Sequence, residues 1–268
     1  MILRAEVSTL NREAFRERII KLNCVLDLER KAVGIKFLHT EEDYRFADAK
    51  PVAVPINYCV MVRLATQGRA LKASGNNLAC LAGARALGLK EIDDYHRSGQ
   101  NGKKLGLYHD MPTAKQARDG MSYCDHQAFG IMVKPLEDYD SQPDVVIMVS
   151  HPYNIMRIVQ GYAYYSGIQS AFKMTGNQAI CSESTAYPYL SNDINVSLLC
   201  IGTRHKAGWS DHELAVGFPI SLFNKIVDGI INTVNIMDNN QKKEVIEKKL
   251  LKNEIDDIKI KYDFNYYR

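Results

Sequence analysis

The sequence lacks any apolar run close to the roughly 20 residues that a membrane-spanning helix needs, so we expect no transmembrane segment. The first residues, Met1 to Arg4, lead directly into a polar helical pattern without the apolar core of a signal peptide. We therefore expect no signal peptide. Both absences predict a cytoplasmic protein that does not bind a membrane.

Several signatures of common enzymes are also missing. The chain contains no Gly-x-Gly-x-x-Gly fingerprint, no P-loop, no Gly-x-Ser-x-Gly elbow and no His-Glu-x-x-His pair. Nucleotide-dependent chemistry and serine hydrolysis therefore have no support from motifs. A formal net charge of +3 is too small to indicate a nucleic-acid surface, and the C-terminal lysines alternate with glutamates as on a solvated helix face.

The composition is that of an ordinary globular protein, with 268 residues, 46% hydrophobic and 24% charged. Hydrophobic periodicity predicts an α/β fold, with α+β as the alternative. We expect one domain over residues 1–238 and a charged helical tail over 239–268. Expected helices cover residues 11–28, 59–70, 80–88, 151–165 and 219–234, and expected strands cover 32–38, 129–135, 144–150 and 195–201.

Two local patterns lead to specific expectations. The run 145–149 is continuously apolar, which is typical of a strand buried on both faces. Ser210 and Glu213 match the capping-box pattern, in which a serine and a glutamate satisfy the first amides of a helix. We therefore expect a helix to begin near Ser210.

Two segments resemble each other, one spanning Cys59 to Cys80 and the other Cys181 to Cys200. In each, a leucine lies two residues before the second cysteine, and a glycine and an arginine follow it. The paired residues are Leu78 and Leu198, Gly83 and Gly202, and Arg85 and Arg204. The pattern predicts a duplication with related halves at about 30–90 and 140–204, a linking insert at 91–128, and a pseudo-two-fold axis. Chance similarity between short segments is the alternative.

Further matches extend over about residues 15–235. They lie at residues 32–37, 58–59, 80–83, 86–89, 143–146, 181, 197–204 and 213–219. On these motifs the chain resembles the family called domain of unknown function 169, or the archaeal conserved region family. None of the motifs is a general catalytic signature, so the resemblance implies a fold and a set of positions rather than a reaction.

The four repeated cysteines, Cys59, Cys80, Cys181 and Cys200, are the main candidates for a site. A duplication would bring both pairs to one axis, and four thiolates are the ligand set of a [4Fe-4S] cluster. Structural zinc is the alternative metal, although zinc sites usually contain closely spaced cysteine pairs, which are absent here. Two further interpretations remain open: small buried hydrophobic side chains, or a reactive thiol without metal.

Three other residues are candidates for catalysis. His126 follows Asp125 and would serve as a general base or a ligand, unless it is an ordinary loop histidine. Arg204 would bind an anionic substrate or pair with Glu183, and a structural salt bridge is equally consistent with the pattern. Of the remaining cysteines, Cys24 is expected in the core, and Cys124 lies close to His126.

We therefore expect a cytoplasmic [4Fe-4S] protein, typical of an anaerobe, that acts on a small molecule by redox or Lewis-acid chemistry. The alternatives are a non-enzymatic module that binds a small ligand and a structural zinc protein. The expected partner is a small molecule, not a nucleic acid or a membrane. A homo-oligomer is compatible with the sequence.

Overall fold

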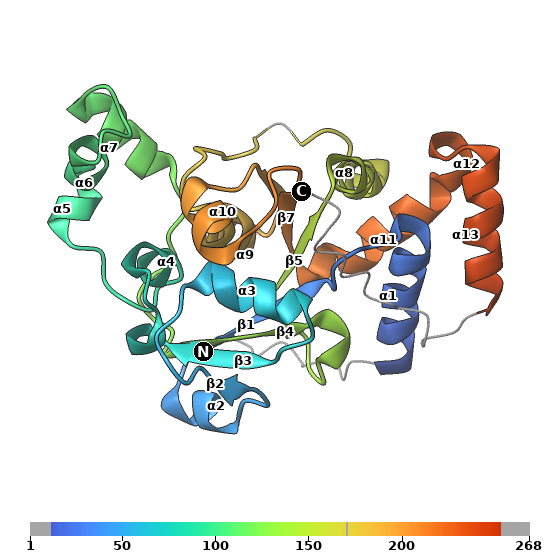
Figure 1. Ribbon diagram of the computed structural model, residues 1–268, viewed down its shortest axis with the longest axis horizontal. Coiled ribbons are helices and arrows are strands. Elements are labelled where there is room, and N and C mark those ends of the chain that lie inside the picture. Colours follow the sequence, from blue (N-terminus) through green and yellow to red (C-terminus); the bar gives the residue numbers. More distant parts are fainter. Residues whose placement is uncertain (1–11, 170, 253–268) are drawn as a thin grey trace, which may run out of the picture.

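The computed structural model describes residues 12–169 and 171–252, and a seven-stranded sheet runs through its centre (Figure 1). The strand order is β2-β3-β4-β1-β5-β7-β6, and every neighbouring pair is antiparallel except β2 and β3. The predicted mixed α/β fold is confirmed. The strands are β1 (Val33–Leu38), β2 (Lys50–Pro51), β3 (Leu71–Ser74), β4 (Gly130–Pro135), β5 (Val145–Ser150), β6 (Asn195–Ser197) and β7 (Leu214–Pro219).

Strand β5 is buried along its whole length, as its apolar run predicts. Val145, Ile147 and Val149 belong to one apolar cluster, whereas Val146 and Met148 belong to another. This alternation follows from the two-residue period of a strand. The sheet is therefore covered by apolar side chains on both faces.

The first face carries a group of short helices that we call the cysteine layer (Figure 1). Buried residues of these helices pack on the odd-numbered residues of β5. The cysteine layer consists of α3 (Tyr58–Thr66), α4 (Leu81–Ala86), the π-helical η3 (Ala179–Ala186), α9 (Tyr187–Ser191) and α10 (Ile201–Ala207).

The opposite face is covered by longer amphipathic helices. Helices α1 (Arg12–Leu26), α8 (Pro152–Ser166) and α11 (Phe223–Asn232) share a second apolar cluster. Ile246 of α13 (Asn240–Lys252) is 2% exposed and belongs to the same cluster. Residues 240–252 of the expected tail therefore pack on the core, and 253–268 lie outside the described residues.

The remaining helices are short and lie between the main elements. Helix α7 (Met111–Gly120) begins at a side-chain cap: the Asp110 carboxylate accepts a hydrogen bond from the Thr113 backbone at 2.8 Å, with Pro112 in the first turn. No helix in the described part of the chain is long and apolar enough to cross a membrane. These helices are α2 (Glu41–Phe46), α5 (Asp94–Arg97), α6 (Gln100–Lys104), α7 (Met111–Gly120) and α12 (Val234–Met237).

The expected helix at Ser210 is wrong, because strand β7 begins directly after the motif, at Leu214. One of the two hydrogen bonds of the motif forms nonetheless: the Ser210 backbone donates to the Glu213 carboxylate at 2.8 Å. The Glu213 backbone donates to the Ser210 carbonyl instead of the Ser210 hydroxyl, at 3.2 Å, and closes a turn rather than a helix. The six residues that follow pair with β5. The expected strand at 195–201 is also shorter, because Cys200 caps α10.

The sheet has a symmetric strand order. Reading outward from the centre gives β1, β4 and β3 on one side and β5, β7 and β6 on the other. The registers correspond as well: Val33 pairs with Pro135, and Val145 pairs with Pro219. Each proline is followed by one short 3-10 turn, η2 (Leu136–Asp138) or η4 (Ile220–Leu222).

The two corresponding sets of strands run beyond the expected 30–90 and 140–204, because each set also includes β4 or β7. The insert 91–128 lies between β3 and β4. That the halves superpose as related units stays a prediction, with which the strand order and register agree.

Helices α8 and α11 touch through their backbones at a pair of glycines. A Cβ atom on Gly229 would lie 2.1 Å from the carbonyl oxygen of Gly161. We expect Gly229→Ala to lower the free energy of unfolding by about 1–3 kcal/mol, the usual cost of overpacking. Gly120→Ala, in α7, is the control, because a Cβ there meets nothing within 4 Å. Equal effects of both substitutions in urea denaturation would contradict this packing.

Candidate functional site

The four repeated cysteines all lie in or directly before helices of the cysteine layer. Cys59 is in the first turn of α3, and Cys80 and Cys200 are the N-cap residues of α4 and α10. Cys181 lies in η3. All four are free thiols.

Their positions follow the symmetry of the sheet. Cys80 follows β3 and Cys200 follows β6, and these two strands hold corresponding places in the strand order. Cys59 lies between β1 and β3, and Cys181 lies between β5 and β6. The four cysteines thus occupy corresponding places in the strand order, as the predicted duplication requires.

Several contacts hold the cysteine-bearing segments together. The Tyr58 hydroxyl, next to Cys59, is hydrogen-bonded to Thr185 of η3 at 2.9 Å. Arg63 of α3 donates to the Ala207 carbonyl of α10. A Cβ on Gly83 would lie 3.9 Å from the Cβ atoms of both Cys80 and Cys181. Segments that are far apart in sequence therefore meet around these side chains.

The thiols also influence one another's ionisation. Burial, together with repulsion from Cys200 and Cys80, raises the pKa of the Cys59 thiol to about 12. Burial and repulsion from the other three cysteines raise the pKa of Cys181 well above its ordinary value. Burial and negative charge on the neighbouring cysteines therefore both disfavour the thiolate forms of Cys59 and Cys181.

The positions of the cysteine side chains decide whether they can bind a single metal ion. Among the described residues, no three or more His, Cys, Asp or Glu side chains are arranged to hold a metal ion. Cys200 is instead engaged locally, where its sulfur accepts a hydrogen bond from the Thr203 backbone at 3.4 Å. The side chains share a neighbourhood but do not form a closed shell around one ion.

Glu183, one of the candidate catalytic residues, is buried in η3 two residues after Cys181. Its carboxylate accepts hydrogen bonds from the Thr175 backbone at 2.7 Å and from the Ser197 hydroxyl. It also borders a cavity of about 280 Å³ that includes Ser182 and Tyr187. Glu183 thus lies beside the cysteines and faces a space of ligand size.

Arg204, which was expected to pair with Glu183 or bind an anion, is hydrogen-bonded to backbone carbonyls. Its guanidinium donates to the backbone carbonyls of Leu198, at 2.8 Å, and Ser210. The acidic side chain near it is Asp211, at 3.9 Å. Within the described residues, Arg204 makes no contact with Glu183. Its hydrogen bonds instead connect the loops before and after α10.

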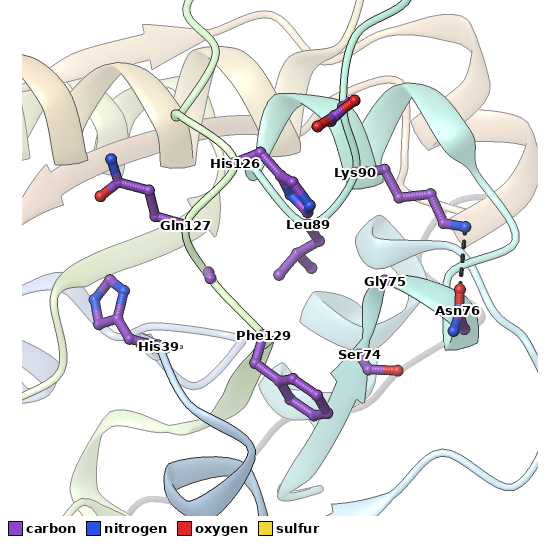
Figure 2. Close-up of a pocket in the computed structure, with 11 residues that line it drawn as sticks. His39, Ser74, Gly75, Asn76, Leu89, Lys90, His126, Gln127 and Phe129 are labelled. Atoms are coloured by element: carbon purple, nitrogen blue, oxygen red, sulfur yellow. Dashed lines mark hydrogen bonds between the residues drawn. The ribbon is translucent and has the colours of Figure 1, made fainter.

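His126 lies at the other end of α4 from Cys80, in a cleft of about 630 Å³. The Gly88 carbonyl accepts from its Nδ1 at 2.9 Å, which leaves Nε2 as the acceptor of the ring. Figure 2 shows His39 and His126 reaching this cleft from different segments, with Lys90 bonded to Asn76 at 3.1 Å.

The sequence did not point to His39, which directly follows β1, because no motif connects it to the loop before β4.

Cys124 is buried near the cleft, and burial with the charge of Asp125 raises its pKa to about 12. Cys24 belongs to α1, on the opposite face of the sheet from the cysteine layer. Neither cysteine is among those that influence the pKa of Cys59 or Cys181.

The raised pKa values predict slow alkylation of Cys59 and Cys124 in metal-free protein. With a pKa of about 12, only about 0.1% of such a thiol is ionised at pH 9, against about half at an ordinary pKa of 9. The iodoacetamide rate at both residues should therefore still rise above pH 10, whereas in urea-unfolded protein it should level off. Peptide mass spectrometry measures both rates, and a folded-state plateau near pH 9 would contradict the prediction.

The sequence of the chain matches a known protein family. Residues 21–229 match the family domain of unknown function 169, described as uncharacterised ArCR. The chain is also 26% identical over 221 residues to the uncharacterized protein MJ0308 of Methanocaldococcus jannaschii, covering 80% of this chain and 93% of that protein. No solved structure matches it. The chain belongs to the domain of unknown function 169 family.

Proposed function

We propose that the chain binds a [4Fe-4S] cluster through Cys59, Cys80, Cys181 and Cys200, and acts on a small molecule by redox or Lewis-acid chemistry. One observation carries the proposal: equivalent cysteines from two symmetric halves influence one another's ionisation on one face of the sheet. The symmetry explains why two pairs, far apart in sequence, lie in the same layer.

The donor set fits such a group chemically. Thiolates are soft ligands, and four of them are the usual complement of a cubane cluster. In the metal-free site, burial and mutual repulsion keep Cys59 and Cys181 protonated. The positive charge of bound iron would offset that repulsion, so binding would proceed with release of protons.

The sequence spacing of the cysteines favours a cluster over zinc. Structural zinc sites usually contain closely spaced cysteine pairs, and the four cysteines of this chain are widely separated in sequence.

The cavity beside Glu183 provides a place for the small molecule. It is bordered by Ser182 and Glu183, which directly follow Cys181, and by residues 172–175. The carboxylate is held by Thr175 and Ser197, so its oxygens are fixed where they can exchange a proton with a bound ligand. A cluster would supply electrons or a Lewis-acidic iron, and Glu183 would hold and move the proton.

The proposal also implies a reducing compartment. Thiolate ligands and iron-sulfur clusters are lost on oxidation, and the four proposed ligands are free thiols. We infer that the protein works in a cytoplasm with little oxygen.

The direct test is purification and reconstitution without oxygen. We expect about four irons and four sulfides per chain and a broad visible absorption band. Replacing any one of the four cysteines by serine should lower the iron content and speed bleaching in air. Cys24→Ser is the matched control and should change neither.

The outcomes separate the alternatives. Stoichiometric zinc without iron, lost in the same four variants, would establish the structural zinc protein instead. Absence of both metals after anaerobic purification and reconstitution would end the metal hypothesis.

The cleft at His126 favours a second candidate, a non-enzymatic module that binds a small ligand. Its volume of about 630 Å³ and its mixed polar and apolar lining are typical of a ligand pocket.

Gln127→Trp should obstruct the cleft and remove any small molecule that copurifies with the protein, as judged by native mass spectrometry. Gln100→Trp, an exposed position in α6, is the control. An unchanged adduct in Gln127→Trp would contradict binding in the cleft.

A further inference from the structure

Arg118 in α7 is a partly buried cation at a small cavity. The cavity, about 60 Å³, lies between the insert helices α6 and α7 and the segment that leads into η3. The Cζ atom of Arg118 lies 3.9 Å from the centre of the Tyr123 ring, and its Nη1 donates to the Tyr123 hydroxyl. Its Nη2 is buried and has no hydrogen-bond partner.

No acidic side chain lines this cavity. Asp93 lies nearby, but it is already hydrogen-bonded to Arg85 at 2.8 Å and to His96 at 2.6 Å. Arg85 and Arg97 add positive charge around Arg118, and burial lowers its pKa to about 10, which still leaves it charged at neutral pH. A partly buried guanidinium with a nitrogen lacking a partner is costly, and a bound anion would offset that cost.

The other polar groups of the cavity can act as donors. The Tyr108 hydroxyl accepts from Asn177 at 3.5 Å, so its own proton can be donated elsewhere. The Gln178 side-chain oxygen accepts from Tyr123 at 2.7 Å, which leaves the Gln178 amide nitrogen as a donor. Asn101 also borders the cavity. The lining thus offers donors around one guanidinium.

We propose that this cavity binds one small anionic group, a phosphate or a carboxylate, through Arg118 and Tyr108. Its volume suits a single such group rather than a whole metabolite. Guanidinium forms strong charge-assisted hydrogen bonds with both kinds of oxyanion. The site is separate from the four cysteines and does not depend on the metal proposal.

The test measures the melting temperature of the full chain against increasing phosphate, sulfate or acetate at constant ionic strength. Ligand binding to the folded state raises the melting temperature in a saturable way, and constant ionic strength removes general screening. We expect this response from the natural protein and from Arg69→Gln, an exposed control. A stronger response to phosphate and sulfate than to acetate identifies a tetrahedral ligand, and the reverse identifies a carboxylate.

Arg118→Gln should weaken the binding of the preferred anion at least about tenfold, because it removes the charge. Tyr108→Phe, which keeps Arg118 and its contact with Tyr123, should weaken it about three- to tenfold. The proposal is overturned if no anion raises the melting temperature of the natural protein, or if Arg118→Gln binds as tightly as Arg69→Gln. If Arg118→Gln does not fold, unchanged affinity in Tyr108→Phe overturns it.

Discussion

The pairing of β1 with β5 is the constraint on which the arrangement of the chain depends. It joins the set β3-β4-β1 to the set β5-β7-β6, and its central pair is Gly34 and Val146. The Tyr139 ring lies against Gly34, where any Cβ would come within 2.4 Å of the ring, and its hydroxyl donates to the Gly34 carbonyl at 2.9 Å. Because side chains alternate across a strand, the register of this pair decides which residues face the cysteine layer.

The positions of the cysteines follow the strand order of the sheet. A helical segment with a cysteine follows each of the central strands β1 and β5, and a capping cysteine follows each of β3 and β6. The Tyr58 hydroxyl and Thr185 connect α3 and η3 directly through a hydrogen bond. The same contacts that bury the apolar residues of the layer also keep the thiols protonated in the absence of a cation.

Elements of the fold could be predicted from the sequence where an apolar pattern is long. The apolar run at residues 145–149 is such a pattern, and it forms the fully buried strand β5. The start of strand β7 could not be predicted in this way. Ser210 and Glu213 match a helix start in sequence, and only the pairing of the following residues with β5 selects a strand. The π-helical turn around Cys181 and the orphan nitrogen of Arg118 depend on packing between distant segments, which a single sequence does not encode locally.

The insert 91–128 contributes to the cavity at Glu183. This cavity combines residues 117 and 120–122 of the insert with residues 172–175 and with Ser182, Glu183 and Tyr187. The segment between β6 and β7 is only 16 residues long, residues 198–213, and holds α10, so it has no room for a counterpart. The cavity that Ser182 and Glu183 border, directly after Cys181, is therefore built in part by the insert, and the other set of strands carries no second insert of this length.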